Sequence, residues 1–206
     1  MNIEIKISKK PVEYAKAIMF LEKRLIKLKN HKGNELMWIL EHPKIYTAGI
    51  NYKDHEILDK NIKIVKTNRG GKITWHGPGQ IICYFVIDLS KRNKDIRKFI
   101  LNLEKIIIKT LEEYKIKSFS DRKNIGIWVN HKNKIKKVSA IGIKVKNWIA
   151  YHGFSINIKN DLKYYEKIVP CGIINREVIN LINIKNQKYN FINKKIIKNF
   201  IKYLKV

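Results

Sequence analysis

Residues 69–84, which read RGGKITWHGPGQIICY, constrain the fold more than any other stretch of the chain. The first half cannot continue as a helix, because Gly70-Gly71 and Gly77-Pro78-Gly79 would break one. The second half runs into the apolar residues 81–89, and a short apolar run bounded by turn residues is typical of a buried strand. We therefore expect a glycine-rich loop with polar side chains, which leads directly into the N-terminal end of a core strand.

This loop has two interpretations on pattern alone. Glycine permits positive φ and lets a ligand approach the backbone closely, which suits a binding loop. Glycine and proline are also the usual residues of tight turns, which favours two turns with no further role. The residues by themselves leave both interpretations open.

Hydrophobic periodicity predicts the other elements. Strands are expected at residues 3–7, 36–40, 62–65, 125–129, 135–145 and 148–158. Helices are expected at residues 11–29, 96–114 and 191–204, and a short helix capped by Asp161 is expected to end at Lys167. Residues 130–133 indicate a hairpin turn, and residues 182–190 indicate a loop.

The order of these elements favours a mixed α/β or α+β fold, because strand-rich runs alternate with only a few helices. At 206 residues the chain is long enough to bury a substantial core. No change in composition marks a boundary, so residues 1–206 are expected to form one domain.

The charge of the chain is unusual. The 44 basic and 17 acidic residues give a net charge of +27, which favours a polyanionic partner such as a nucleic acid or an acidic protein. The alternative is compositional bias, because Lys, Ile and Asn are abundant throughout and the lysines are spread rather than clustered.

Nothing in the sequence predicts export or membrane insertion. The opening residues alternate and lack an apolar leader, and the longest uninterrupted apolar run, residues 81–87, is far too short to span a bilayer. The two cysteines, Cys83 and Cys171, do not form a disulfide framework. A cytoplasmic location, without a membrane, is the simplest expectation.

Cys171 is the residue best suited to nucleophilic chemistry. It stands between Pro170 and Gly172, which suits an exposed turn, and a thiolate is a strong nucleophile and acyl acceptor. The alternative is a buried, inert thiol, which is the interpretation we favour for Cys83 in its apolar strand. His76 and His152 match no metal-binding spacing, so no metal site is expected.

Several blocks of sequence together resemble one enzyme family. They are RGGKITWHGPGQ from Arg69 followed by Tyr84, KVSAIGIK at 137–144, HGFSIN at 152–157, VPCG at 169–172, and LEHPKIYTAG at 40–49. In their order and approximate spacing these blocks resemble the lipoyl(octanoyl) transferases. The resemblance covers roughly residues 36–181.

This resemblance implies a fold, a reaction and two catalytic residues. The fold is that of biotin and lipoate protein ligases, with mixed sheets flanked by helices. The reaction moves an octanoyl group from acyl carrier protein to a lysine of a lipoyl domain, in 2-oxoacid dehydrogenase complexes or in the H protein of glycine cleavage. Cys171 would carry the acyl group as a thioester and Lys137 would assist, with neither ATP nor a metal as cofactor. Lys136 is the competitor of Lys137, and on a strand the two point to opposite faces.

The resemblance also implies which residues line the acyl pocket, where backbone N–H groups can serve as an oxyanion hole. The implied residues are Arg69, Gly70, Gly71, Lys72, Ile73, Thr74, Trp75, His76, Ala140, Ile141, Gly142, Gly153, Phe154 and Ser155.

The sequence departs from the family pattern at two places, and two other functions compete. Asn180 stands where the family usually has a hydroxyl residue before Leu181, and Ile125 before Gly126 is bulkier than usual. One rival is an ATP-dependent lipoate protein ligase, whose chemistry needs no cysteine. The other is a nucleic-acid-binding module, which would interleave basic and aromatic residues in one groove. The diffuse basic residues and the VPCG block argue against both.

Overall fold

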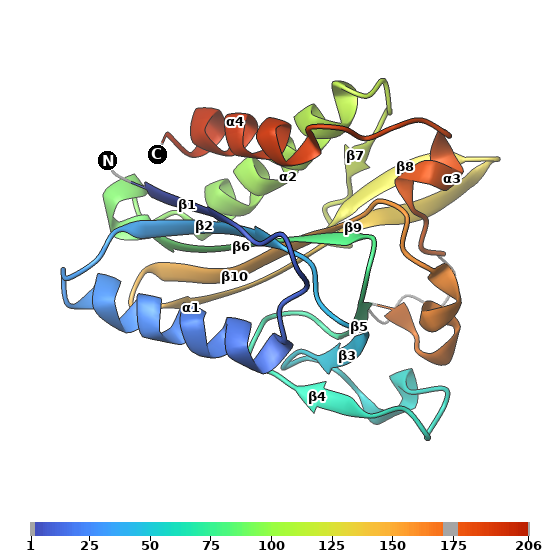
Figure 1. Cartoon of the computed structure of the whole chain (residues 1–206), viewed down its shortest axis with the longest axis horizontal. Helices are drawn as coiled ribbons and strands as arrows, with labels where there is room; N and C mark the ends of the chain where they lie inside the picture. Colours follow the sequence, from blue (N-terminus) through green and yellow to red (C-terminus); the bar gives the residue numbers. More distant parts are fainter. Residues whose placement is uncertain (1–2, 171–176, 206) are drawn as a thin grey trace.

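The computed structural model describes residues 3–170 and 177–205. Within these ranges the strands form a seven-stranded sheet in the order β1-β2-β6-β10-β9-β8-β7 and a three-stranded sheet in the order β4-β3-β5. Helices cover both faces of the large sheet, and the small sheet lies at one end of it (Figure 1). The architecture confirms the expected mixed sheets flanked by helices.

The large sheet is antiparallel except where β1 runs parallel to β2. Its strands are β1 (Ile3–Ile7), β2 (Glu35–Leu40), β6 (Gln80–Asp88), β7 (Phe119–Ser120), β8 (Ile127–His131), β9 (Lys134–Lys146) and β10 (Ile149–Asn157). The small sheet consists of β3 (Ile45–Ala48), β4 (Ile64–Lys66) and β5 (Ile73–His76).

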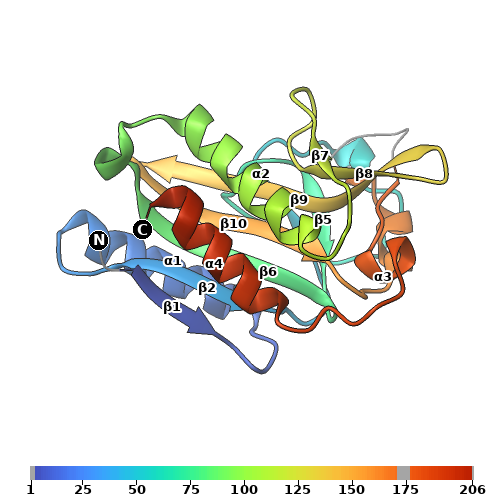
Figure 2. The same ribbon diagram turned by 90° about the horizontal axis from the view of Figure 1, so that it is seen from above.

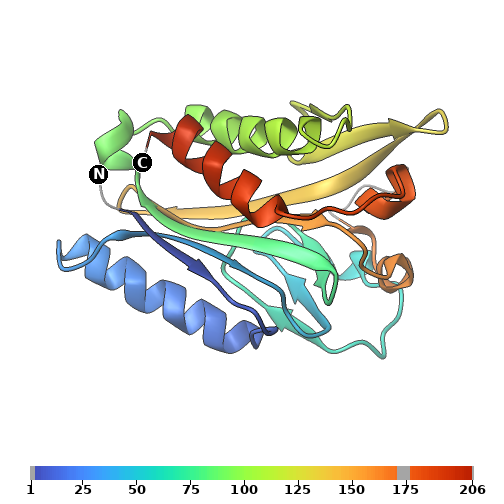
Figure 3. The same ribbon diagram turned by 45° about the horizontal axis from the view of Figure 1, so that its top comes forward.

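The long helices sandwich the large sheet. Helix α1 (Tyr14–Lys29) packs on one face, and α2 (Ile96–Glu112) and α4 (Ile192–Leu204) pack together on the other (Figures 2 and 3). The shorter helical segments are η1 (Asp54–Glu56), η2 (Leu89–Arg92), η3 (Leu162–Lys167) and α3 (Leu181–Ile184). Among the described residues, no helix has the length and apolarity that crossing a membrane requires.

Strand β6 is apolar on both faces because helices cover both. Ile81, Cys83, Phe85 and Ile87 belong to the core under α2 and α4, whereas the alternate residues Ile82, Tyr84 and Val86 belong to the core under α1. Burying one such side chain contributes about 1.5–3 kcal/mol, so a strand buried on both faces is a large part of the stability. The buried strand expected at 81–89 is confirmed.

The predicted hairpin and helices are confirmed with small shifts in their ends. Lys132 and Asn133 form the turn between β8 and β9, with φ values of 52° and 60°, as a two-residue hairpin turn requires. The cap by Asp161 is also confirmed, since its carboxylate accepts from the Lys163 N–H at 3.0 Å.

Several short elements were not predicted from the sequence, among them β3, β5 and α3. Strands β3 and β5 lie in segments without an expected strand, and β5 falls inside the glycine-rich stretch. Each has four residues, too few for a clear period, and their pairing with each other stabilises both. Helix α3 occupies the start of the expected loop 182–190, where the Asn180 side chain accepts from the Asn183 N–H at 2.9 Å.

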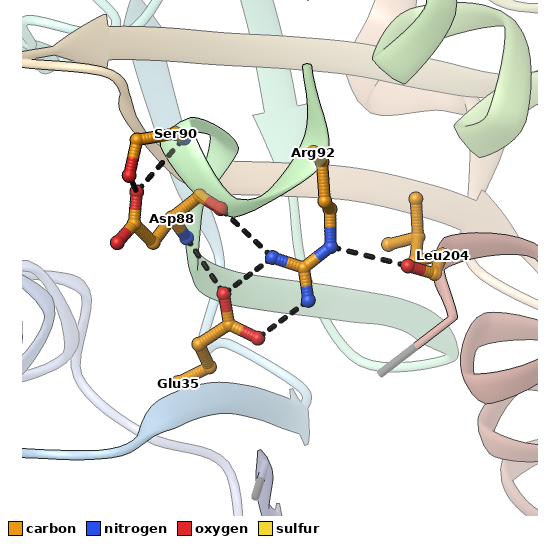
Figure 4. Close-up of polar contacts among 5 residues, drawn as sticks. All are labelled: Glu35, Asp88, Ser90, Arg92 and Leu204. Carbon is orange, nitrogen blue, oxygen red and sulfur yellow. Dashed lines mark hydrogen bonds and ion pairs between the residues drawn. The ribbon is translucent and has the colours of Figure 1, made fainter. Parts of the chain in front are cut away.

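A buried ion pair joins the large sheet to the C-terminal helix (Figure 4). The Arg92 guanidinium binds both carboxylate oxygens of Glu35, at 2.5 and 2.6 Å, and donates to the Asp88 carbonyl at 2.8 Å. The Asp88 N–H donates to Glu35 at 2.8 Å, and the Arg92 Nε donates to the Leu204 carbonyl at 3.1 Å. One guanidinium therefore connects β2, the end of β6 and the end of α4.

Replacing Arg92 should destabilise the protein strongly. Arg92→Met leaves the Glu35 carboxylate buried without its cation, which costs about 3–5 kcal/mol when a buried pair loses one member. Urea unfolding near pH 7 measures the loss. The matched control is Arg24→Met, because Arg24 pairs with Glu4, whose side chain is 45% exposed, and such pairs contribute about 1 kcal/mol or less. Equal losses in both variants would contradict this role of Arg92.

Candidate active site

A cavity of about 610 Å³ lies where the glycine-rich loop meets β9 and β10. Twelve of the predicted pocket residues line it, together with Lys137: Arg69, Gly70, Gly71, Lys72, Thr74, His76, Ala140, Ile141, Gly142, Gly153, Phe154 and Ser155. Blocks of sequence that lie far apart in the chain therefore meet around one space.

Ile73 and Trp75 are the two predicted pocket residues that do not line this cavity. Both are buried on the other face of β5, in a core with Tyr46, Tyr165 and Ile168. Side chains alternate along a strand, so Thr74 and His76 reach the cavity while their neighbours point away from it. The prediction of a continuous lining from 69 to 76 is corrected accordingly.

The loop at Arg69 is fixed to both sheets. Arg69 donates through Nη2 to the carbonyl and hydroxyl oxygens of Thr47 on β3, both at 2.9 Å. The Gly70 N–H donates to the Ile143 carbonyl on β9 at 3.1 Å. A Cβ on Gly70 would lie 2.6 Å from that carbonyl oxygen, so only glycine permits this approach.

Lys137 lies buried in the cavity wall, with 5% of its surface exposed. Its Nζ donates to the Ile125 carbonyl at 3.2 Å and lies 4.6 Å from the centre of the Trp128 ring. Lys136 points to the other face, where it forms an ion pair with Glu177. The predicted separation of the two lysines is confirmed.

Of the two cysteines, Cys83 is among the described residues and Cys171 is not. Cys171, the predicted acyl acceptor, lies outside the described residues. The described segments on its two sides are held in place, since the Val169 N–H donates to the Glu56 carbonyl at 2.7 Å and the Lys137 N–H donates to the Glu177 carbonyl at 2.8 Å. Cys83 is fully buried in β6, where burial raises the pKa of its thiol, as expected for an inert core residue.

His42 and His76 are buried beside the cavity and are held as neutral rings. The His76 Nδ1–H donates to Gln80 Oε1 at 2.7 Å, and His42 bonds the Tyr84 hydroxyl at 2.9 Å through Nε2. Burial lowers the pKa of His42 to about 4. Burial, and then the neighbouring His42 and Arg69, lower the pKa of His76 to about 3.

His152 also lines this cavity. Its Nε2–H donates to Asn68 Oδ1 at 2.7 Å, and its φ of 70° lies in the left-handed region, which side chains other than glycine rarely adopt. Burial, and then Arg69 and Lys144, lower the pKa of this ring to about 3. Among the described residues, no three His, Cys, Asp or Glu side chains are placed to hold a metal ion.

Several residues of the cavity wall are not among those predicted from the sequence. Ile100 reaches it from α2, and Lys123 and Asn124 reach it from the loop before β8. Ile100 belongs to a helix whose period predicts only core packing, and Lys123 is one lysine among many. Ile143 and His152 lie inside the motif blocks at 137–144 and 152–157. Their position in these blocks is the sequence signal that could have identified them.

Comparison with known proteins assigns the chain to a family. The model of the lipoyl protein ligase A/B catalytic domain matches residues 14–204. An octanoyltransferase of Ehrlichia ruminantium (strain Gardel) is 41% identical over 199 residues, covering 94% of this chain and 96% of the relative. This chain belongs to the octanoyltransferase family. Another member, the octanoyltransferase of Anaplasma marginale (strain Florida), is 41% identical over 181 residues, covering 87% of this chain and 85% of the relative.

Solved structures share the fold at low sequence identity. A bipartite lipoate protein ligase from Thermoplasma acidophilum matches with a TM-score of 0.75 and 11% identity, covering 100% of this chain and 84% of the other. The biotin protein ligase of Aquifex aeolicus matches with a TM-score of 0.52 and 15% identity, covering 99% of this chain and 69% of the other. These matches confirm the predicted fold class of this octanoyltransferase-family chain. Its extent as one domain over residues 1–206 stays a prediction.

The buried histidines should make the folded state sensitive to acid. Histidines of the unfolded chain bind protons below about pH 6.5, whereas the folded rings stay neutral down to about pH 4, so stability falls as the pH drops between these values. Each ring should cost on the order of 2 kcal/mol at pH 5. Urea unfolding from pH 7.5 to 5 measures the slope. In His76→Gln the slope should be smaller by about one proton, and an unchanged slope would contradict the neutral buried ring.

Proposed function

We propose that this chain transfers an octanoyl group from acyl carrier protein to a lysine of a lipoyl domain, through a thioester on Cys171. The observation that carries the proposal is the convergence of three of the family's sequence blocks, at 69–80, 137–144 and 152–157, on one cavity, with Lys137 buried in its wall. Ile82, Ile141 and Phe154 give that cavity an apolar surface suited to an alkyl chain. Gly70 and Gly71 of the glycine-rich loop line the same space, and we infer that backbone N–H groups there serve as the oxyanion hole.

In the first half-reaction the Cys171 thiolate attacks the carbonyl carbon of the octanoyl thioester. The bond between that carbon and Cys171 forms, and the bond to the carrier's sulfur breaks. The carrier thiolate leaves with a proton from the Lys137 ammonium, so that Lys137 becomes neutral. Exchange of one thioester for another is nearly balanced in energy. Backbone N–H groups at the cavity stabilise the oxyanion of the tetrahedral intermediate that links the two thioesters.

In the second half-reaction the neutral amine of the acceptor lysine attacks the acyl-enzyme. The carbon–nitrogen bond forms, neutral Lys137 takes the proton from that nitrogen, and Cys171 leaves as a thiolate. Thiolate and ammonium are both restored, so the cycle consumes no ATP and uses no metal. Amide formation drives the overall transfer.

The proposed partners follow from this chemistry and from the family. The acceptors are lipoyl domains of 2-oxoacid dehydrogenase complexes and the H protein of glycine cleavage, in the cytoplasm. An ATP-dependent lipoate protein ligase is the rival on the same fold. The octanoyltransferase relatives, at 41% identity, support the transferase. The structural matches, at 11% and 15% identity, support only the fold.

Octanoyl-acyl carrier protein should load one octanoyl group onto Cys171. Intact-mass analysis should detect a single adduct that hydroxylamine removes, as expected for a thioester. The adduct should be lost in Cys171→Ser and persist in Cys83→Ser, because Cys83 is buried in the core. Octanoate with ATP should give no adduct and no acceptor modification. An adduct on Cys83, or acyl transfer that requires ATP, would overturn the proposal.

The two neighbouring lysines provide a matched pair for testing the role of Lys137. Lys137→Ala should lower the iodoacetamide alkylation rate of Cys171 near pH 7 by about tenfold, because the thiolate loses a cation at the cavity. Lys136→Ala should change the rate by less than about twofold, because Lys136 pairs with Glu177 on the other face. Similar effects in both variants would show that diffuse positive charge, and not Lys137, favours the thiolate.

A further inference from the structure

Strand β8 supplies the surroundings of the Lys137 ammonium. Trp128 of β8 pairs directly with Lys137 of β9, and a register irregularity lies between Ile127 and Trp128. Ile127 pairs with Ser139, so one residue of β9 is left over at this point. Bulges of this kind re-aim side chains and are frequent beside active sites. Here the irregularity accompanies an indole ring that lies under the Lys137 Nζ, 4.6 Å from the ring centre.

The indole ring is itself held firmly. Trp128 is 1% exposed, and its Nε1–H donates to the Asn124 carbonyl at 2.9 Å. Asp121 fixes the same loop, since its carboxylate accepts from the Lys123 N–H and from the Asn124 side chain, both at 2.9 Å. The ring is therefore a preorganised surface rather than a mobile side chain.

The next residues of this loop form the other wall around Lys137. Gly126 has a φ of +135°, and a Cβ there would lie 2.8 Å from the Ser139 carbonyl oxygen and 3.1 Å from Lys137 Cε. Glycine thus lets the loop close on the lysine side chain, while the Ile125 carbonyl accepts from Nζ at 3.2 Å. The ammonium has a carbonyl oxygen and a ring face as neighbours.

We propose that Trp128 is a positioning residue for acyl transfer, which holds the Lys137 ammonium at the cavity wall through its ring face while the Ile125 carbonyl orients it. This inference rests on the proposed role of Lys137. A cation over an indole face is attracted by the negative potential of the ring, and the attraction is strongest where water is excluded, as it is around these two residues. Fixing Lys137 in this way keeps its ammonium group in position to stabilise the Cys171 thiolate and to protonate the leaving sulfur of the carrier.

Fluorinated tryptophans at position 128 test the proposal without changing the shape of the side chain. Progressive fluorination weakens the negative face of the ring but keeps the indole N–H that binds Asn124. With a short octanoyl thioester as donor, kcat should fall stepwise by up to about tenfold across the series, with KM within about twofold. The control is the same series at Trp148, which is 40% exposed and lies 5.8 Å from Lys94 Nζ; kcat there should stay constant.

An NMR measurement reports the position of Lys137 independently of activity. The ring current of Trp128 should shift the Lys137 side-chain resonances upfield, assigned by their absence in Lys137→Met, and Trp128→Leu should remove that shift while Trp128→Phe keeps part of it. A flat fluorination series in folded enzyme, or an absent ring-current shift, overturns the positioning role. Normal transfer by Lys137→Met would instead overturn the proposed role of the lysine, so the two failures are distinguishable.

Discussion

Burial of β6 on both faces is the constraint on which the rest of this structure depends. The strand pairs with β2 on one side and β10 on the other, and its alternate side chains enter two separate cores. Because neither face meets water, α1 must cover one side and α2 with α4 the other. The chain entering β6 is consequently anchored between two cores, and the glycine-rich loop before it is attached to a fully buried strand.

This anchoring explains why the cavity forms at one end of the sheet. The loop cannot follow the strand into the core, since its polar groups need partners, and it finds them on β3 and β9. Arg69 and Gly70 thereby connect the small sheet to the large one across the cavity. Residues on both sides of the space are fixed by such hydrogen bonds, which is the arrangement that precise positioning of the octanoyl group requires.

Much of this could be predicted from the sequence, and the failures have physical causes. Helix α2 was found because its apolar residues repeat at a helical period over many residues, and β6 was found because it is an uninterrupted apolar run bounded by turn residues. The strands β3 and β5 were missed because four residues do not establish a period, and their pairing connects segments distant in sequence. The motif blocks located most of the cavity wall. They did not show that Thr74 faces the cavity and Trp75 faces away from it, because that depends on the alternation of side chains along β5. Trp128 carried no sequence signal, because its proposed role depends on the register irregularity at which Lys137 becomes its cross-strand neighbour.

The contact between Arg92 and the Leu204 carbonyl has a consequence for how the chain is made. It joins residues 112 positions apart, while Arg92 and Glu35 are 57 positions apart. The apolar surface of α2 that α4 covers therefore stays exposed during synthesis until α4 has emerged from the ribosome. Such distant contacts make folding slow, since the entropy of closing a long loop is lost before the contact forms. The order of synthesis thus leaves one face of β6 without its full cover until residues 192–204 are available, and the apolar surface exposed in that interval favours aggregation.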